Sequence, residues 1–434
     1  MSNINYHIET KRIHAGYSSA AHGKSVNVPI YQTAAFDLED IDRARRLWTG
    51  AESGGIYSRV GNPTVSVLEE RIAALDGGAA AIGLSSGMAA IAYTVLLLSE
   101  GGGNIISASS LYGAAHESLA HFFPKFGVKT KFVKNRDDIK EYESLIDDNT
   151  RAIYLESVSN PNIEIYDFEA IAEVAHKHGV PLVIDNTVAT PYLFRPFEHG
   201  ADIIVYSATK GLSGHGNVIA GLVVEKGGFE FKKERFPQFH EKSYKMRDLK
   251  GNPRTPIEFA PSNPFIAALK IFYLEFIGAE LSAFDAYLAL QGLSTIAERL
   301  DKQVETTKKL VRYLESKKEV AWVRHPFAKG SKYKALAERY FPKGAGAVLS
   351  FGFNGTREQL KKFITALEIF SYHVNIGDVR SLIANPPETT HSELSPDLQE
   401  LSGIPANLVR ISVGLENADD LIEDLNNAFD KAFK

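Results

Sequence analysis

The chain has 434 residues, of which 44% are hydrophobic and 23% are charged, and its formal net charge is −5. These values are typical of an ordinary globular protein of more than one domain, and they exclude a disordered, collagen-like or coiled-coil chain. The absence of cysteine excludes disulfides, thiolate metal sites and a cysteine nucleophile.

Charge and hydropathy also predict the location of the protein and whether it binds nucleic acid or a membrane. Short lysine runs such as Lys232-Lys233 are typical of solvated helix faces, so no nucleic-acid partner is predicted. Residues 1–12 are polar where a signal peptide would be apolar, which favours a cytoplasmic location. The apolar stretches 88–98 and 265–293 are respectively too short and too often interrupted by charge to span a membrane, so no membrane association is predicted.

The first predicted elements lie beyond residue 53. Residues 1–53 show little periodicity, and we expect an extended N-terminal arm that contributes to an oligomer. From residue 79 to 225, apolar runs of strand length alternate with helical patterns, which is typical of a layered α/β sheet. The predicted strands are 79–84, 104–108, 130–133, 151–155, 181–184, 203–206 and 218–224, and the predicted helices include 88–98, 115–123 and 168–178.

The second half of the chain begins with a long segment without a clear period. Residues 229–264 are rich in Pro, Lys, Phe and Tyr, and we interpret them as an insertion near the active site. A helix over 279–293 leads to strands near 321–325, 347–353 and 409–413 and to helices near 358–367 and 418–429. The predicted parts are therefore the arm 1–53, a large domain 54–285 and a smaller C-terminal α/β domain 286–434.

Lys210 follows a predicted strand in the segment Ser207-Ala208-Thr209-Lys210-Gly211. A sheltered amine is nucleophilic and can form a Schiff base with a carbonyl cofactor, and the hydroxyls of Ser207 and Thr209 could bind a phosphate. The alternative is an exposed loop lysine, which is the more common situation for any single lysine.

Asp185 ends another buried strand, in Ile184-Asp185-Asn186-Thr187. A carboxylate at this position is costly unless it is paired, and it is the group that can hold a pyridine nitrogen protonated. Asp185 alone could be a helix cap. Asp185 and Lys210 are separated by one helix-sized crossover, however, which places both at strand ends of one sheet.

The turn Ser85-Ser86-Gly87-Met88 lies between a strand and an apolar helix, where free N–H groups favour an anion. By itself this turn is common. Tyr112, after another strand, could stack on a cofactor ring or simply pack in the interior.

Several motifs together resemble the Cys/Met-metabolism enzymes, which use pyridoxal 5'-phosphate (PLP). Their order and spacing match over nearly the whole chain, and they are Tyr57-Ser58-Arg59, Ser86-Gly87-Met88, Leu111-Tyr112-Gly113, Glu156-Ser157, Asn160-Pro161, Asp185-Asn186-Thr187, Ser207-Ala208-Thr209-Lys210 and Arg410-Ile411-Ser412-Val413-Gly414. The resemblance implies fold type I, the aspartate-aminotransferase-like α/β fold, with a large mostly parallel sheet domain and a smaller C-terminal domain.

The resemblance also implies roles for individual residues. Lys210 would carry PLP as a Schiff base and move protons, Asp185 would face the pyridine nitrogen, and Tyr112 would stack on the ring. Tyr57 and Arg59 would complete the phosphate site from a neighbouring subunit, giving at least a dimer and often a homotetramer. The other implied cofactor contacts are Ser86, Gly87, Met88, Asn160, Thr187, Ser207 and Thr209, and the implied substrate contacts are Arg410, Asn375 and Ser381. Tyr57 and Tyr112 are candidates for assisting proton transfer, and no metal is implied.

Within this family, the chain is most similar to the O-acetylhomoserine sulfhydrylases. The similarity rests on the long segment 229–264, the stretch 278–293 and Asn375-Ile376-Gly377-Asp378. The absence of cysteine counts against methionine γ-lyase, whose similar site has a cysteine near the stacking tyrosine.

The resemblance predicts γ-replacement on O-acetyl-L-homoserine. Sulfide or methanethiol would displace acetate and give homocysteine or methionine. Two alternatives stay open: γ-elimination to 2-oxobutanoate and ammonia, as in cystathionine or methionine γ-lyase, and a binding protein that has lost catalysis. The acyl group on homoserine and the sulfur donor are not determined by the sequence.

Overall fold

The structure, a computed structural model, describes residues 6–392, 399 and 402–434. Its largest sheet has seven strands. In spatial order they are β1 (Ala80–Leu84), β7 (Gly221–Glu225), β6 (Ile203–Ser207), β5 (Leu182–Asp185), β4 (Thr150–Glu156), β2 (Gly103–Ala108) and β3 (Val128–Val133). β7 is antiparallel to both its neighbours, and the strands from β6 to β3 are parallel. All seven predicted strands are confirmed, with small shifts at their ends.

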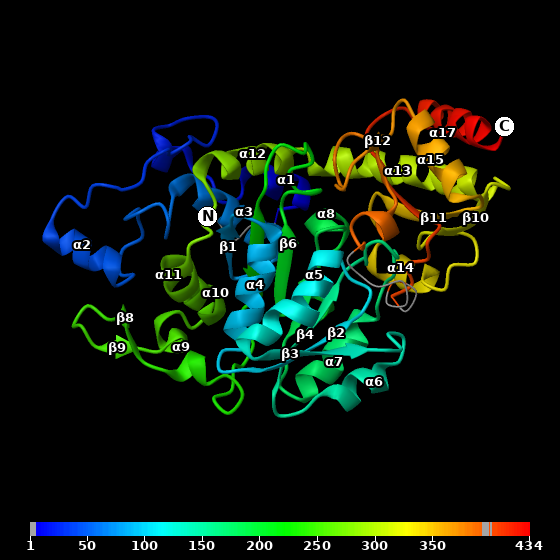
Figure 1. Cartoon of the computed structure of the whole chain (residues 1–434). Helices are drawn as coiled ribbons and strands as arrows, with labels where there is room; N and C mark the ends of the chain where they lie inside the picture. The colour runs from blue at the N-terminus through cyan, green and yellow to red at the C-terminus, as the bar shows by residue number, and fades with distance from the viewer. Residues whose placement is uncertain (1–5, 393–398, 400–401) are drawn as a thin grey trace.

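Helices cover both faces of this sheet, because its strands are apolar on both sides. Along β5, Val183 packs into one core with α4 (Gly87–Leu98), and Ile184 packs into the other with α3 (Pro63–Asp76). The remaining helices around the sheet are α5 (Gly113–Glu117), α6 (Ile139–Leu145), α7 (Phe168–Lys177), α8 (Thr190–Leu193), α10 (Pro264–Ala268) and α11 (Glu275–Ile277). Figure 1 shows the sheet in the middle of the molecule with α4 and α5 in front.

The predicted helix 115–123 is only partly α-helical. α5 ends at Glu117 and continues as a π-helical turn, Ser118–Phe122. The predicted helices 88–98 and 168–178 are confirmed as α4 and α7.

The N-terminal segment contains more helix than the sequence predicted. It includes α1 (Ile8–His14), a 3-10 helix (Ser19–His22) and α2 (Ile41–Trp48), with extended chain between them. α1 packs on α3 and α12, and Arg12 forms an ion pair with Glu298. The contribution of the N-terminal arm, residues 1–53, to an oligomer stays a prediction.

The segment 229–264 forms a small subdomain at the left of Figure 1, near α2. It contains a 3-10 helix (Pro237–His240), the two-stranded sheet of β8 (Ser243–Arg247) and β9 (Pro253–Arg254), and α9 (Pro256–Phe259). Phe231, Phe236 and Phe239 are buried beside Phe265 of α10. Its phenylalanines therefore attach the segment to the core beside the large sheet.

A second sheet follows α12 (Ala283–Ser294) and the 20-residue helix α13 (Ile296–Glu315). Its order is β10 (Val320–Arg324), β11 (Val348–Phe353), β14 (Leu408–Ser412), β13 (Leu382–Ala384) and β12 (Ser371–Tyr372), antiparallel except between β12 and β13. The other helices of this region are α14 (Lys334–Tyr340), α15 (Arg357–Ala366) and α17 (Ala418–Phe433).

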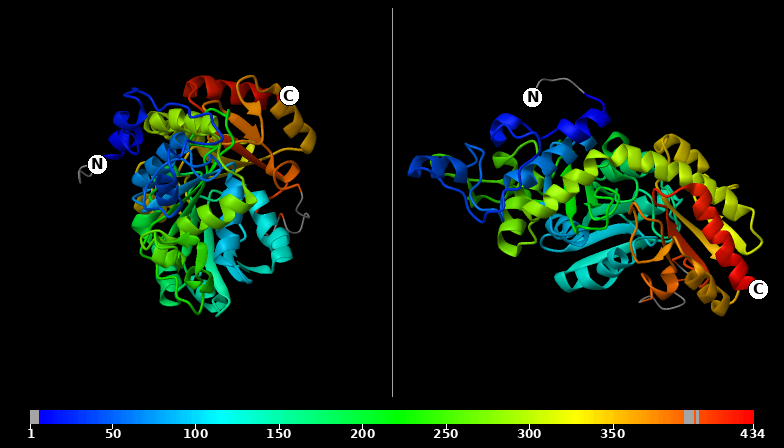
Figure 2. Two further views of the ribbon diagram at one scale, coloured as in Figure 1. Left: turned by 90° about the vertical axis from the view of Figure 1, so that its left-hand side faces the viewer. Right: turned by 90° about the horizontal axis from the view of Figure 1, so that it is seen from above.

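Figure 2 shows α12 and α13 extending from the part of the molecule with the large sheet to the part with the second sheet. The three predicted strands and two predicted helices of this region are confirmed. The predicted helix 279–293 begins later, at Ala283, because Ser282 caps it. The predicted boundary between residues 285 and 286 falls inside α12, and the division into domains stays a prediction.

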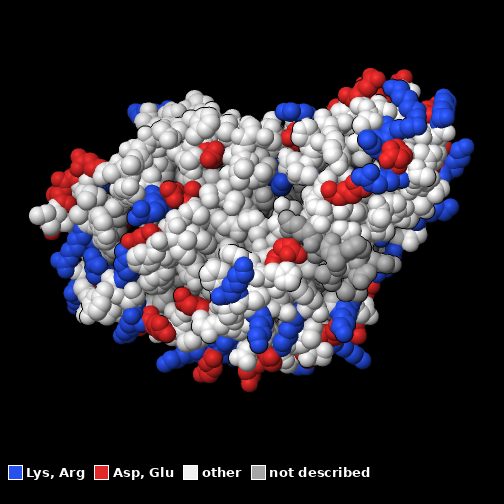
Figure 3. Space-filling view, in the orientation of Figure 1, with Lys and Arg blue, Asp and Glu red and all other residues white. Residues whose placement is uncertain are grey.

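Charged side chains are unevenly distributed on the surface. Figure 3 shows both signs of charge along the lower edge and at the two ends, while the middle of this face is mostly uncharged. Within the described part of the chain, no helix combines the length and apolar character that crossing a bilayer requires.

Candidate active site

A cavity of about 240 Å³ lies at the carboxyl ends of the parallel strands β4, β5 and β6. Residues from the second sheet and its loops form the other side. Such a crevice is where open α/β sheets usually bind ligands. The predicted residues that line it are Ser86, Gly87, Met88, Tyr112, Asn160, Asp185, Thr187, Ser207, Thr209, Lys210, Asn375 and Arg410.

Lys210 lies just after β6, in a turn that its backbone N–H closes by donating to Ser207 O at 3.2 Å. Its Nζ donates to Asn375 Oδ1 at 2.6 Å. Burial, with a smaller contribution from the positive charge of Arg410, lowers the pKa of Lys210 to about 8. Near neutral pH a useful fraction of the amine is therefore uncharged and nucleophilic.

Asp185 ends β5 beside Glu156, which ends β4. Asp185 Oδ1 accepts from the Thr187 N–H at 3.0 Å, and Oδ2 accepts from the Tyr154 hydroxyl at 3.1 Å. Burial raises the pKa of Asp185, while its hydrogen bonds lower it. A carboxylate in this position suits a cationic ring nitrogen.

An anion cradle lies at the N-terminus of α4. The Ser86 side chain caps the helix by accepting from Ala89 N at 3.1 Å, so the N–H groups of Gly87 and Met88, at the first two helical positions, have no acceptor within the helix. A Cβ on Gly87 would lie 2.7 Å from Ser207 Cβ, so only glycine lets α4 approach the end of β6 this closely. The two N–H groups at the start of α4 and the nearby hydroxyls of Ser207 and Thr209 thus surround a space suited to a phosphate.

Two hydroxyl groups near the cradle form hydrogen bonds within the protein. Thr187 Oγ1 accepts from Ser207 N at 2.8 Å, and Thr209 Oγ1 accepts from Ala220 N at 3.0 Å. These bonds hold the ends of β5 and β6 together beside α4.

Arg410 on β14 is 3% exposed and enters the cavity from the second sheet. It donates to Asn160 Oδ1 at 3.2 Å and to Asn375 O at 3.1 Å, and its Nε has no partner in the described structure. Burial lowers its pKa to about 10, so it stays a cation at neutral pH. A buried guanidinium that forms no ion pair with any described carboxylate suits an anionic ligand.

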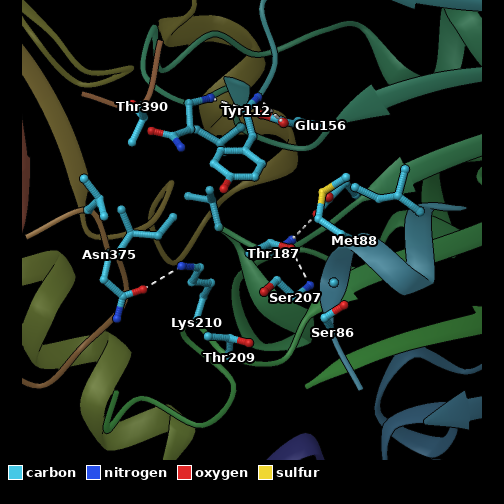
Figure 4. A pocket seen from close by; sticks show the side chains of 18 of the residues that line it. Ser86, Met88, Tyr112, Glu156, Thr187, Ser207, Thr209, Lys210, Asn375 and Thr390 are labelled. Atoms are coloured by element: carbon cyan, nitrogen blue, oxygen red, sulfur yellow. Dashed lines mark hydrogen bonds between the residues drawn. The ribbon is translucent and has the colours of Figure 1, made fainter. Parts of the chain in front are cut away.

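Tyr112 is 40% exposed, and its backbone N–H donates to Glu156 Oε1 at 2.7 Å. Figure 4 shows its side chain on one side of the cavity, Lys210 and Asn375 on another with Thr209 just below Lys210, and Ser86 and Ser207 toward the helix that carries Met88. The Tyr112 ring thus lies across the cavity from the anion cradle, where it could cover a planar group.

Three predicted site residues do not line this cavity. Ser381 Oγ donates to Glu416 Oε2 at 2.8 Å and accepts from Gly414 N at 2.9 Å, so the geometry does not support direct contact between Ser381 and a substrate. Tyr57 and Arg59 lie at the surface beside other hollows, together with residues of the N-terminal segment. Within a single chain, neither reaches Lys210.

Some cavity residues were missed from the sequence. Glu156 was not predicted as a site residue, although a carboxylate that ends a buried strand is the same signal that identified Asp185. Thr390, Ile219 and Val374 also line the cavity and lie in loops without a recognisable pattern.

The insertion 229–264 contributes no residue to the cavity lining, so its predicted place near this active site is wrong for a single chain. Its aromatic side chains pack beside α10 instead. Lys245, Arg247 and Phe259 line a hollow together with Tyr57 and Arg59.

The residues around the cavity fit PLP on structural grounds. The cradle at α4 suits the phosphate, Asp185 suits the ring nitrogen, Tyr112 can cover a ring, and Lys210 can bind the carbonyl carbon. PLP alone accounts for the phosphate cradle, the buried carboxylate, the exposed tyrosine ring and the sheltered lysine in one cavity.

Comparisons with known proteins agree with this fit. The family model for Cys/Met metabolism PLP-dependent enzymes matches residues 9–430. The "Sulfhydrylase FUB7" of Gibberella moniliformis is 44% identical over 98% of each chain. The "Homocysteine synthase" of Schizosaccharomyces pombe is 41% identical, over 98% of this chain and 99% of its own.

A solved structure is similar over the same length. It is an O-acetylhomoserine (thiol)-lyase from Campylobacter jejuni with a pyridoxyl-lysine monophosphate, at a TM-score of 0.92 and 35% identity, covering 98% of this chain and 100% of that one. Because the family model and these relatives span nearly the whole sequence, the chain belongs to the Cys/Met metabolism PLP-dependent enzymes.

Proposed function

We propose that the protein catalyses γ-replacement on O-acetyl-L-homoserine, with sulfide as the donor, giving L-homocysteine and acetate. Methanethiol, giving methionine, is the second donor that fits the proposal. The observation that carries it is a lysine of lowered pKa and a buried arginine that forms no ion pair with any carboxylate among the described residues. The two side chains share one cavity and one partner, Asn375. The names of the relatives, which include a sulfhydrylase and a homocysteine synthase, support this substrate class.

Bound PLP supplies an electron sink that stabilises negative charge at carbons next to the amino group. Lys210 Nζ moves protons at Cα and Cβ of the substrate, a task suited to an amine whose pKa is about 8. At Cγ the C–O bond breaks and acetate leaves with the bonding electrons. Sulfide, as HS−, then forms the C–S bond at the same carbon and keeps its proton, and Lys210 returns the protons that it removed to Cβ and Cα, so that the amine is regenerated.

Arg410 would orient the substrate through its α-carboxylate. Its planar guanidinium is fixed by Asn160 and Asn375, and Nε has no partner among the residues that the structure describes. The same Asn375 holds Lys210 through its side chain, so the carboxylate and the Cα–H of a substrate are positioned relative to each other.

Apolar side chains would limit access of water to the reacting carbons. Ile91, Val158, Val188, Ile219, Val374 and Ile376 line the cavity between the polar groups. Excluding water favours attack by sulfide over hydrolysis.

We also propose a homotetramer in which subunits share active sites. Tyr57 and Arg59 do not line the cavity of their own chain, and Arg59 lies over the Tyr57 ring at 5.1 Å. Large apolar side chains are exposed nearby, including Ile41, Phe276 and Ile277, and a second copy of the chain would cover them. In this arrangement Tyr57 and Arg59 would complete the phosphate site of the neighbour. A cytoplasmic location stays a prediction.

The test is a paired assay on the purified, PLP-loaded protein. Homocysteine and 2-oxobutanoate are measured from O-acetyl-L-homoserine with and without sulfide. Homocysteine that forms only with sulfide, with little keto acid, is the expected result. Keto acid that dominates in both reactions, or rapid 2-oxobutanoate release from cystathionine or methionine, would instead assign the protein to the γ-lyases.

A further inference from the structure

Two carboxylates face the cavity side by side. Glu156 and Asp185 are register partners at the ends of the parallel strands β4 and β5. Adjacent strands lie about 4.8 Å apart, and both side chains point to the same face of the sheet and line the cavity. Since both are buried, the two groups cannot easily carry negative charge at the same time.

Their hydrogen bonds differ in kind. Glu156 accepts from two backbone N–H groups, Tyr112 N at 2.7 Å and Asn160 N at 3.1 Å. Asp185 accepts from Thr187 and, at Oδ2, from the Tyr154 hydroxyl at 3.1 Å. The oxygen of Asp185 nearest β4 is thus held by a side chain that one substitution can remove.

Tyr154 lies two residues before Glu156 on the same face of β4 and is 1% exposed. Ser107 Oγ donates to its backbone carbonyl at 2.7 Å, which fixes β4 against β2 at this point. In the part of the chain that the structure describes, the Tyr154 hydroxyl makes one hydrogen bond, the one to Asp185.

We propose that Tyr154 is a positioning residue that keeps the single negative charge of the Glu156–Asp185 pair on Asp185, where it faces the pyridine nitrogen of PLP. The phenol donates only to Asp185 and makes ionisation of that carboxyl group more favourable than ionisation of Glu156. Glu156 then stays protonated and serves mainly to fix the backbone of Tyr112 and Asn160.

The electrostatic surroundings support this division. Burial raises the pKa of Glu156 well above its usual range, the charge of Asp185 raises it further, and the N–H groups of Tyr112 and Asn160 only partly oppose these shifts. Burial also raises the pKa of Asp185, but the bonds from Thr187 and Tyr154 oppose that shift. The other titratable groups around Asp185 are Tyr206 on β6, Tyr112 after β2, Lys210 across the cavity and Arg410 on β14.

The proposal rests on cofactor binding and not on the identity of the acyl substrate, so it is tested on apo-protein without substrate. PLP is titrated into Tyr154→Phe and wild-type apo-protein from about pH 5 to about pH 9, with absorbance as the readout. At neutral pH, we expect the affinity of the variant to fall about tenfold, the effect of one hydrogen bond to a charged group.

The pH dependence gives the sharper readout. Loss of the phenol donor raises the pKa of Asp185, so Asp185 becomes protonated at a higher pH as the solution is acidified. The acid side of the affinity profile should therefore move upward by about one pH unit. A residue with only a structural role would weaken binding equally at every pH.

Tyr142→Phe is the matched control, because Tyr142 is fully buried and its hydroxyl donates to Arg136 O at 3.3 Å, away from the cavity. We expect wild-type affinity and profile for this variant, and similar unfolding temperatures for both apo-variants. Asp185→Asn tests the role of Asp185 separately from that of Tyr154. This variant has no carboxyl group at position 185 to titrate, so its PLP affinity should lose the decrease on the acid side of the pH profile. If Asp185→Asn does so and Tyr154→Phe keeps the wild-type profile, the role of Tyr154 is overturned while that of Asp185 stands.

Discussion

The two sides of the cavity differ in how completely the protein pairs their polar atoms. On the side formed by β4 and β5, every carboxylate oxygen of Glu156 and Asp185 accepts a hydrogen bond. On the side formed by the second sheet, Arg410 is buried, its Nε has no partner, and no ion pair to it occurs within the described residues. We call these the sheet side and the arginine side.

This difference matches two kinds of ligand. A preorganised side that is nearly complete without its ligand suits a cofactor that stays bound through many turnovers. A buried cation without a counter-charge is costly, and an anionic substrate relieves that cost each time it binds. The degree of hydrogen bonding within the protein thus distinguishes the side that holds the cofactor from the side that binds the substrate in each turnover.

Lys210→Ala should have the largest effect, because Lys210 connects the two sides. We expect homocysteine formation to fall at least about 1,000-fold, since both the amine that binds PLP and the proton carrier are lost. Initial rates with O-acetyl-L-homoserine and sulfide measure this. Turnover within tenfold of wild type would contradict the assignment of Lys210.

Arg410→Gln should act mainly on the arginine side, because its effect on cofactor capture is limited to a higher pKa of Lys210. Loss of a buried charged contact to the substrate carboxylate should lower kcat/KM about 100-fold, while the affinity for PLP stays near that of wild type. Steady-state kinetics and a PLP titration separate the two effects. Arg380→Gln, at an exposed arginine of the same region, should change neither. Equal losses in both measurements would show that the two sides are not independent.

The pH dependence of cofactor capture sharpens the comparison further. The amine of Lys210 attacks a carbonyl only when it is uncharged, so association of PLP with apo-protein should slow about tenfold for each pH unit below the pKa of about 8. Removing the Arg410 charge raises the pKa of Lys210, and the profile of Arg410→Gln should therefore move to higher pH. Stopped-flow absorbance measures both profiles; a midpoint near that of an ordinary lysine in wild type would contradict the lowered pKa.

Gly87→Ala should have the smallest effect and be confined to the sheet side. The new methyl group would meet Ser207 Cβ and Cα at 2.7 Å and 2.9 Å, and α4 must shift to relieve the contact. We expect about fivefold weaker PLP binding, equivalent to about 1 kcal/mol of overpacking. Gly61→Ala, where an added Cβ has no neighbour within 4 Å, is the control for PLP titration. Identical affinities for the two variants would argue against close approach of α4.

The sheet side was predictable from the sequence because its residues directly follow strands. Asp185 and Ser207 end apolar runs, and parallel strands bring such ends to one edge. The same reasoning would have identified Glu156. The resemblance to a family supplied Arg410 and Asn375, since no local pattern relates β14 and the loop before β13 to β5.

Other elements could not be predicted for physical reasons. β12 and β13 contain two and three residues, too few for a strand pattern. The insertion 229–264 contains many aromatic side chains, but composition does not say which surface they pack on. α13 was missed despite a clear signal, because Leu300, Val304, Val311 and Leu314 recur at helical spacing on its buried side.

Asn375 has a consequence for how this enzyme can change by mutation. Its side chain holds Lys210 and its backbone carbonyl holds Arg410, so one loop residue sets the location of both the proton carrier and the substrate clamp. A substitution in the second sheet that displaces this loop alters reactivity and recognition together. New substrate preferences should therefore arise more readily from the apolar lining, at positions such as Ile219 and Val374, than from changes behind Asn375.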